Sequence, residues 1–354
     1  MKKMIAMILC CTLVIVLSGC AGTTVVVGEC TCPPESHAQT AIPDDLPPEG
    51  TLKLGLAIVP NISKSVSATA DANGKAEFDV TVVAVTVDAN GIIQDCIIDS
   101  VGTSAEFAAA GNPVNIAPGS VGAANAVQVL TKNELGFDYG MVKASKIGRE
   151  WFEQAGALAA FAQGKSVKEV QDTYASDVDL ATSASIYLGN YVSAMETAVA
   201  NAVPLGAEAG HELKLAVTAS LETSVKEAGG GMAQLYVDAA ALTMKGDVIT
   251  ACTIDSLQAP VEFDGTGAIT TDLSVAPKTK NQLGADYGMA KASKIGMEWN
   301  EQVVNFCAYV SGKTADEVAG IRVTEEKKPA DVDLAAECSI AIGGFQTLIA
   351  KAVG

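Results

Sequence analysis

Histidine is almost absent from the 354-residue chain, which has only His37 and His211. A His-based catalytic triad built into both halves is therefore excluded. The sequence also lacks a Cys-x-x-Cys pair, a Walker loop and a Gly-x-Gly-x-x-Gly stretch after a strand, so none of these common redox or phosphate sites is expected. Basic residues are few, with 23 Lys and Arg against 41 Asp and Glu and a net charge of −18. Because phosphate backbones repel such a surface, we expect no nucleic-acid partner.

One apolar run stands out, and it lies at the start of the chain. Lys2 and Lys3 precede the apolar residues 4–17, and Ser18-Gly19-Cys20 follows. This order is typical of a secretory signal peptide, and the run is too short to span a bilayer comfortably. The segment Leu17-Ser18-Gly19-Cys20 resembles the bacterial lipobox, which implies lipidation of Cys20 and cleavage before it. An ordinary signal peptide that contains a cysteine is the alternative. We expect residues 1–19 to be the signal peptide and the protein to be lipid-anchored in the cell membrane, facing outside the cytoplasm.

Residues 20–50 lack periodicity and hold five prolines among small and polar residues, which predicts a flexible, solvated tether after the lipidated cysteine. Cys30-Thr31-Cys32 and His37 lie within it. A zinc site usually needs four ligands at paired spacings, so we expect no metal there.

The remaining chain contains an internal repeat. Residues 131–154 return at 279–302 with 19 identities in 24 positions, and shorter blocks around Cys96 and Asp177 return around Cys252 and Asp331. The offset changes along the chain, so the first copy has extra residues near 111–122 and the second near 324–329. A period this long indicates tandem domains, which we expect to fold separately over 51–203 and 209–354.

Each copy predicts strands followed by helices. Residues 78–82 and 83–87 alternate apolar and polar side chains in opposite phase, which indicates a bulge or a strand buried on both faces. Turns at 88–91 and 245–247 lead into returning strands. A helix is expected from Tyr139 through Trp151 to Ala155, because apolar residues recur at helical spacing. Last helices are expected over 182–202 and 337–353. The fold class is therefore α+β, with two tandem repeats that each pack an antiparallel sheet against helices.

One segment resembles a cofactor attachment site. Asp179-Leu-Ala-Thr182-Ser183-Ala184-Ser185 precedes an apolar helix and is similar to the acceptor segment of the FMN-binding domain family of extracytoplasmic flavoproteins. The strand, glycine turn and strand at 85–98 resemble that family in outline. The resemblance implies covalent FMN at Ser185, although the family has Thr at this position. The second copy departs further, because Glu337 and Cys338 precede Ser339.

The same residues also fit purely structural roles. Asp, Thr and Ser before an apolar helix are typical of N-capping, since their oxygens accept free backbone N–H groups. The repeated residues Lys132, Asn133, 138–141 and Trp151 would either line a ligand cleft, with Tyr139 or Trp151 stacked on a ring, or form a helix start and its core face. We favour capping and core packing, and we retain Asp179, Thr182, Ser183, Ser185, Tyr139 and Trp151 as candidate cofactor-binding residues.

Four cysteines lie within the repeats. Cys96 and Cys252 are equivalent, and we expect buried thiols there rather than a bridge between the copies. Cys307 and Cys338 both replace alanines of the first copy, Ala159 and Ala184. Their joint appearance predicts a Cys307–Cys338 disulfide between two helices.

Together these patterns favour a non-catalytic binding or accessory module on a membrane tether, distantly similar to FMN-binding domains. Its partners would be the membrane, through the lipid, and a small ligand or an envelope protein. A covalent FMN carrier in extracytoplasmic electron transfer is one alternative, and a structural envelope or adhesion protein is another. No catalytic residues are proposed, because no nucleophile has a recognisable base beside it.

Overall fold

A computed structural model describes residues 50–108, 113–115, 128–227 and 229–354. The predicted signal peptide, Cys20, most of the tether with Cys30, Cys32 and His37, and nearly all of the extra residues of the first copy lie outside this part of the chain. The described residues between Gly50 and Gly354 form one compact unit. No helix within the described residues has the length and apolar character to cross a membrane.

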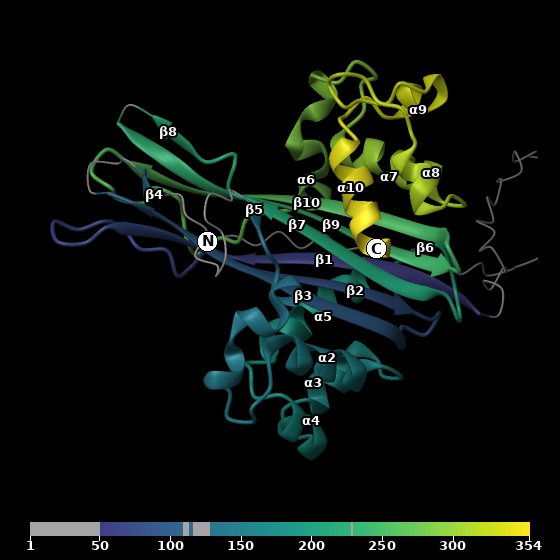
Figure 1. The fold of residues 1–354 in the computed structure, drawn as a ribbon, viewed down its shortest axis with the longest axis horizontal. Helices are drawn as coiled ribbons and strands as arrows, with labels where there is room; N and C mark the ends of the chain where they lie inside the picture. Colours follow the sequence, from purple (N-terminus) through teal and green to yellow (C-terminus); the bar gives the residue numbers. More distant parts are fainter. Residues whose placement is uncertain (1–49, 109–112, 116–127, 228) are drawn as a thin grey trace, which may run out of the picture. The chain divides into compact units, whose positions relative to one another are not determined.

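The first repeat contains five strands and then a series of short helices (Figure 1). They are β1 (Thr51–Asn61), β2 (Gly74–Val87), β3 (Ile93–Phe107), β4 (Pro113–Asn115), β5 (Gln128–Val129), α1 (Lys132–Leu135), the 3₁₀ helices η1 (Gly136–Tyr139) and η2 (Met141–Lys143), α2 (Trp151–Ala162), α3 (Val167–Thr173), α4 (Val178–Ser183) and α5 (Gly189–Ala200).

The second repeat follows strand β6 (Val203–Glu208); its helices come in the same order as those of the first, and its three long strands correspond to β1, β2 and β3. They are β7 (Glu212–Ser220), β8 (Val225–Glu227), β9 (Gly230–Lys245), β10 (Val248–Asp264), α6 (Lys280–Leu283), η3 (Gly284–Tyr287), η4 (Met289–Lys291), α7 (Trp299–Val310), α8 (Ala315–Ala319), α9 (Val332–Glu337) and α10 (Gly343–Val353). The predicted α+β class, with antiparallel sheets and helices in each repeat, is confirmed.

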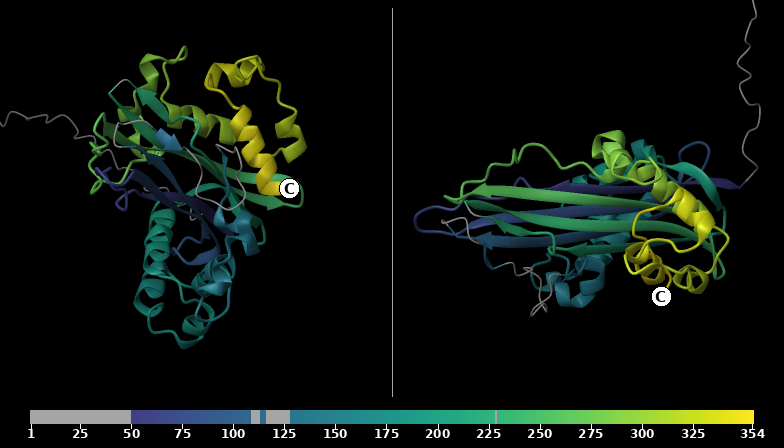
Figure 2. Two further views of the ribbon diagram at one scale, coloured as in Figure 1. Left: turned by 60° about the vertical axis from the view of Figure 1, so that its left-hand side comes forward. Right: turned by 90° about the horizontal axis from the view of Figure 1, so that it is seen from above.

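Two antiparallel sheets lie face to face between two layers of helices (Figures 1 and 2). The first has the strand order β4-β3-β2-β1-β6 and the second has β10-β9-β7-β5, with β8 paired to β9. Helices α2–α5 cover the outer face of the first sheet, and α7–α10 cover the outer face of the second. Strand β2 is accordingly buried on both faces: Val82 and Ala84 face the other sheet, and Val83 and Val85 face the helices. This confirms the second of the two interpretations of its phase switch.

The inner faces of the sheets form one continuous hydrophobic core. Phe107 and Phe263, which occupy equivalent positions, stack there with ring centroids 3.9 Å apart and parallel planes. The second sheet also contains an edge strand from the first repeat, because β5 pairs with β7. The two repeats are therefore halves of one folded unit, and the expectation of two separately folding domains does not fit this arrangement. A repeat in the sequence shows that a unit was duplicated, but it does not reveal which face each copy buries against the other.

The helical predictions need two corrections. Residues 139–150 do not form an α-helix continuous with α2. Beyond Tyr139, which ends η1, they contain only the short 3₁₀ helix η2, because Gly140 and Gly148 adopt positive φ angles of 75° and 64° and the chain turns at each. Helix α2 begins only at Trp151, with Glu150 as its N-cap. The predicted last helices, 182–202 and 337–353, begin later than expected, at Gly189 for α5 and at Gly343 for α10. The residues before them end the separate short helices α4 and α9, after which the chain is extended at Ala184 or Cys338. The apolar pattern did not reveal this break.

Candidate functional site

A cavity of about 540 Å³ opens in the second repeat, between strand β9 and the helical layer. Its lining comes from β9, the start of α6, η4 and the loop before α7, the start of α7, the turn before α9, and the segment that runs from the end of α9 into α10. The lining combines aromatic rings, lysines, hydroxyls and one carboxylate: Tyr236, Asp238, Lys280, Met289, Ala292, Ser293, Lys294, Trp299, Lys328, Ser339, Ile340, Ala341, Gly344 and Phe345. A cavity of this size with a few polar groups on apolar walls is typical of small-molecule sites.

Lys280 is held at the inner end of the cavity by the local structure of α6. Thr279 caps this helix and, with Gln282, forms a reciprocal capping box. Asp255 on β10 accepts the backbone N–H of Asn281 at 3.1 Å, and this bond fastens the helix start to the sheet. Lys280 is consequently directed inward and is only 6% exposed.

Three aromatic rings surround the Lys280 ammonium. Its Nζ lies 4.9 Å from the ring centroids of Tyr236 and Trp299 and 5.1 Å from that of Tyr287, and it donates a 2.8 Å hydrogen bond to the Tyr236 hydroxyl. Such cation–π contacts favour a charged lysine in a partly dry site. Burial lowers the pKa of Lys280, whereas the carboxylates of Asp238 and Asp255 act in the opposite direction. The cation is therefore caged rather than solvated.

Asp238 supplies the nearest negative charge on the cavity wall. Burial raises the pKa of its carboxyl, and both the Ser256 hydroxyl, which donates to Oδ1, and the Lys280 ammonium counteract this shift. A carboxylate and a caged lysine thus line the same cavity and influence each other electrostatically.

The first repeat builds the same lysine arrangement with different neighbours. Lys132 lies 5.2 Å from the Trp151 ring and 5.6 Å from the Tyr139 ring, and 3.8 Å from an oxygen of Asp79. Asp79 occupies the strand position of Tyr236, so the negative charge here sits two residues earlier along the strand. Tyr191 replaces Phe345, and its hydroxyl accepts the indole N–H of Trp151 at 2.9 Å.

A fully buried glutamine connects the repeated block to the predicted acceptor segment. Gln154 accepts the backbone N–H of Ser185 at 2.7 Å and its hydroxyl at 3.2 Å. Gln302 accepts the corresponding groups of Ser339 at 2.8 and 3.0 Å. The amide nitrogens of both glutamines donate to a serine of the preceding loop, Ser145 or Ser293. This residue fixes both serine-bearing segments relative to the helices that begin at Trp151 and Trp299.

The candidate cofactor residues of the first repeat do not converge on one point. Asp179 and Thr182 are exposed on α4, where the Thr182 hydroxyl donates to the Asp179 carbonyl at 2.8 Å, and Ser183 ends that helix. The N-cap of α4 is Asp177, not Asp179. Ser185 is exposed in the extended stretch beyond α4, so it does not lie at a helix N-terminus as expected.

The two aromatic candidates are near each other around Lys132. Trp151 is 1% exposed and belongs to the helix-side core, while Tyr139 is half-buried beside it. In the second repeat the equivalents Trp299 and Ser339 both line the cavity. The lysine was noted in the sequence only as part of the repeated block, and the glutamine and the strand residues Tyr236 and Asp238 were not selected. The glutamine kept identical within the repeated block was the available signal for that residue.

The cysteine pairing differs from the prediction. Cys96, Cys252, Cys307 and Cys338 are all buried as free thiols, so the expected Cys307–Cys338 disulfide is not formed in the structure. The Sγ atom of Cys307 instead contacts that of Cys252 at 3.4 Å. The strand under α7 brings these two residues together, and a comparison of helix sequences alone does not reveal that contact.

Comparisons with known proteins give no further guide, since no family model, curated protein or solved structure matches this chain.

Proposed function

We propose that this chain is a membrane-tethered extracytoplasmic lipoprotein whose second repeat binds a small anion that carries a flat apolar group. The observation that supports the proposal is the cavity beside Lys280, where lysines and aromatic rings line the same walls. The tether and lipid anchor rest on the signal sequence and Cys20. Binding without catalysis is the simplest use of such a site.

The charge distribution favours an anionic ligand. The chain as a whole is strongly acidic, with a net charge of −18, yet Lys280, Lys294 and Lys328 all line this one cavity. Lys328 is paired with Glu326 at 2.7 Å, and Asp238 offsets part of the charge of Lys280. An arriving phosphate or carboxylate would exchange water for these ammonium groups in a partly dry site, where the attraction is stronger than in bulk water.

The apolar walls favour a ring on the same ligand. Trp299 and Phe345 lie with ring centroids 6.2 Å apart at 75°, and Met289 and Ile340 complete the wall. The hydroxyls of Ser293 and Ser339 lie 3.4 Å apart and both bond to the side-chain amide of Gln302. Among the described contacts neither hydroxyl has an imidazole or carboxylate partner to activate it, which supports binding rather than nucleophilic catalysis.

A covalent flavin carrier is the second candidate, and one observation favours it. Ser339, the equivalent of the acceptor serine, lines the same cavity as Trp299. For FMN the lysines would hold the phosphate and the Trp299 side would face the ring, and the flavin would supply electron transfer. In the first repeat, Ser185 would carry FMN on an exposed segment that, among the described residues, has no aromatic wall like that beside Ser339.

The test is a titration of the mature chain with FMN, riboflavin and phenyl phosphate. Riboflavin carries the flavin ring without phosphate, and phenyl phosphate carries a smaller ring with it. We expect both phosphates to bind and Lys280→Gln to weaken them at least tenfold. The matched variant Lys132→Gln, which removes the equivalent lysine of the first repeat, should leave affinity unchanged. Equal losses in the two variants, or binding of none of the three probes, would contradict the proposal.

Covalent attachment and anchoring are tested separately. Protein matured beside an active flavin transferase should keep its peptide mass if the site only binds, and should gain one FMN, lost in Ser185→Ala or Ser339→Ala, if it is a carrier. Cys20→Ala should abolish lipid labelling and release the protein from membranes. Unchanged labelling and fractionation of that variant would remove the lipoprotein proposal without affecting the ligand site.

A further inference from the structure

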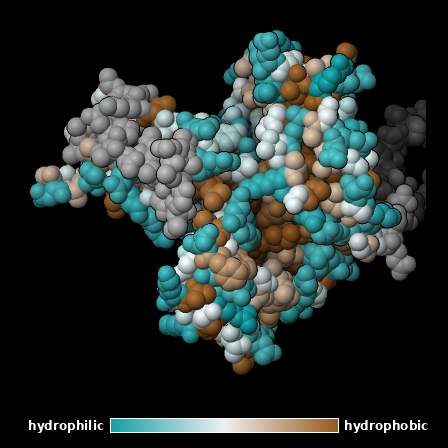
Figure 3. Space-filling view, in the orientation of Figure 1, coloured by the Kyte–Doolittle hydropathy of each residue, from teal (hydrophilic) through white to brown (hydrophobic). Residues whose placement is uncertain are grey.

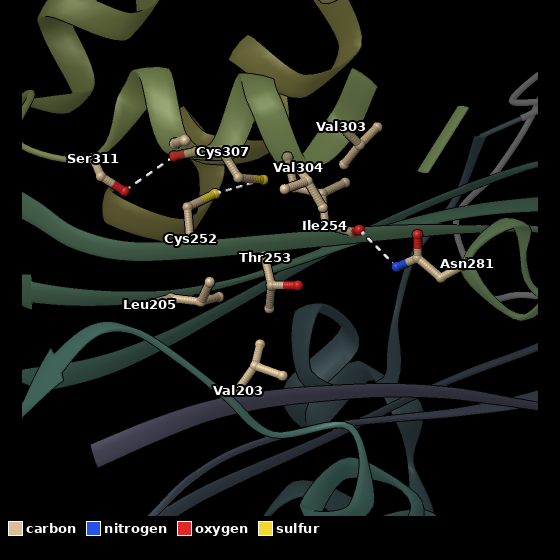
Figure 4. Close-up of a pocket in the computed structure, with 11 residues that line it drawn as sticks. Val203, Leu205, Cys252, Thr253, Ile254, Asn281, Val303, Val304, Cys307 and Ser311 are labelled. Atoms are coloured by element: carbon tan, nitrogen blue, oxygen red, sulfur yellow. Dashed lines mark hydrogen bonds between the residues drawn. The ribbon is translucent and has the colours of Figure 1, made fainter. Parts of the chain in front are cut away.

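A second cavity, of about 320 Å³, lies between β6, β10 and α7 and has two thiols in its wall (Figure 4). Val203 and Leu205 of β6 face Ile254, Val303 and Val304 across it. Cys252 projects from β10 and Cys307 from α7, and their side chains point toward each other with the sulfurs 3.4 Å apart. Both residues are buried, at 2% and 6% exposure.

The first repeat shows that packing alone does not require this pair. It keeps a cysteine at the strand position, Cys96, but has Ala159 where Cys307 stands, and Ala159 is as buried as Cys307. A small apolar side chain is therefore sufficient between helix and sheet. The second thiol is an addition specific to the second repeat, and it is placed in contact with the thiol common to both.

We propose that Cys252 and Cys307 form a disulfide that covalently joins β10 to α7. Each thiol loses a proton. One thiolate attacks a protein or small-molecule disulfide and expels its first thiolate, and the other thiolate then attacks the protein sulfur of the mixed disulfide and expels the second. Two electrons pass to that disulfide oxidant, which leaves as two thiols. The sulfurs need to approach from 3.4 Å to about 2.05 Å, a movement that side-chain rotation and a small helix shift supply. The bond in the cell depends on the extracytoplasmic location proposed above, but the pairing itself does not.

Burial determines when this bond forms. Its neighbour Cys307 and desolvation both raise the pKa of Cys252, so the folded chain holds little thiolate there. Oxidation is therefore fast before α7 packs onto the sheet and slow afterwards, and the finished bond resists reductants for the same reason.

Cys338 is the competing partner. It ends α9, and burial raises its pKa to about 11, with a smaller contribution from Cys307 nearby. The recorded sulfur contact of Cys307 is with Cys252, which favours the strand-to-helix bond over the helix-to-helix bond predicted from the sequence.

Peptide mapping under non-reducing conditions tests the pairing in full-length protein exported to an oxidising compartment. The same protein, unfolded, reduced and refolded with a glutathione redox buffer, provides a second sample that does not depend on export. We expect a Cys252–Cys307 crosslink in both samples, intact in Cys338→Ala and absent in Cys307→Ala. A Cys307–Cys338 crosslink, or free Cys252 and Cys307 in the refolded sample, would overturn the proposal. If only the exported sample lacks the crosslink, the location is wrong and the pairing stands.

Two further measurements separate the bond from general effects of substitution. Reduction should lower the melting temperature of the parent protein by several degrees and leave that of Cys307→Ala unchanged. The variant Ala159→Cys places the same pair in the first repeat, where it should crosslink to Cys96. An unchanged melting temperature on complete reduction of the parent would show that no such bond stabilises the fold.

Discussion

The two repeats share a skeleton but differ in what surrounds the buried lysine. Both fasten Lys132 or Lys280 above a tryptophan through the same capped helix, and both bind a serine segment through a buried glutamine. The second repeat adds residues 324–329, which form a tight turn in which the Lys327 carbonyl accepts the backbone N–H of Ile342 at 2.8 Å. Lys328 of this turn lines the cavity.

The comparison teaches which part of the site is framework and which part is specialised. The repeated block sets the position of the lysine, because its capping and glutamine contacts recur in each copy with nearly the same distances. The insertion and the residues at the start of α10 shape the walls, since Ala341 and Gly344 stand where the first repeat has Tyr187 and Asn190. The ligand binding that we propose for the second repeat alone would thus depend on small changes at the rim of its cavity.

The surface between the two helical layers is more hydrophobic than the exposed surface of the helices. Figure 3 shows hydrophobic residues gathered in this strip, where the sheets reach the surface. The polar helices on either side cover the outer faces of the sheets, whereas the strip lies along the line where the two repeats meet.

The largest expected effect comes from separating the repeats. Residues 209–354 expressed alone would expose the inner face of the second sheet, including Leu235, Val237 and Leu257, which are fully buried in the complete chain. We expect aggregation or loss of cooperative unfolding, because that face has no other cover. Circular dichroism melts and size-exclusion chromatography of this fragment beside residues 50–354 provide the measurement. A monomeric fragment with a cooperative melt would restore the view of two independent domains.

A second prediction concerns the closeness of helix and sheet in the first repeat. A Cβ atom at Gly55 would lie 2.1 Å from the Ala198 carbonyl oxygen of α5, whereas the equivalent residue of the second repeat is Lys214. Gly55→Ala should therefore destabilise the protein by about 3 kcal/mol or more, since backbone must move. Lys214→Ala and Gly102→Ala, whose added Cβ meets only ordinary contact at 3.8 Å, serve as controls in urea unfolding. Equal, small effects at all three positions would contradict the close packing.

The third prediction concerns a buried aspartate that both repeats share, Asp99 in the first and Asp255 in the second. Burial raises the pKa of Asp99 and of Asp255 to about 6 from an ordinary value of 3.8, against the opposing hydrogen bonds that both accept. The folded state therefore favours the protonated form. The resulting stabilisation is fully present below pH 4 and is lost as pH rises through 6.

Each aspartate contributes on the order of 3 kcal/mol at most, since one pKa unit corresponds to about 1.36 kcal/mol. Urea unfolding at pH 5 and pH 7.5 should show higher stability at pH 5, and Asp99→Asn or Asp255→Asn should each remove part of the difference. Stability that falls between pH 7.5 and pH 5 in the parent protein would show that other groups dominate.

The smallest expected effect comes from removing the insertion that distinguishes the proposed ligand cavity of the second repeat from the first repeat. Deleting residues 324–329 makes the segment before α9 as long as the equivalent segment of the first repeat and removes Lys328 from the cavity. We expect at least tenfold weaker phenyl phosphate binding, about 1.4 kcal/mol, with the melt little changed because the first repeat lacks this turn. Lys328→Ala should produce a smaller loss in the same titration. Unaltered affinity in the deletion variant would place the ligand away from this wall.

Much of the fold was accessible from local sequence patterns. Alternation at 78–87 predicted a strand with either a bulge or two buried faces, and the structure selected the second. The Asn-Gly and Lys-Gly turns located the hairpins, since strand periodicity and positive φ are local properties. The helix boundaries were less accessible. Gly140 and Gly148 interrupt an apolar spacing of about 3.6 residues that continues across them, so the pattern was preserved while the backbone turned.

The candidate site was accessible only in part. Tyr139, Trp151 and Ser185 were selected, and their equivalents in the second repeat include two residues of the cavity wall. Tyr236 and Asp238 belong to no recognisable motif. They lie some 40 to 60 residues before the repeated block, and only the register of the sheet brings them close to it. The same reason explains the cysteines, since Cys252 meets Cys307 across the contact between a strand and a helix.

By itself the sequence determined the duplication, the α+β class, the hairpins and the lysine–tryptophan block, because each depends on residues close together in the chain or on identity between the copies. Only the tertiary structure decided that the two sheets share one core, that β5 joins the opposite repeat, and that a cavity opens beside Lys280. These features depend on which buried face meets which, and local pattern does not encode that choice when both sheet faces are apolar.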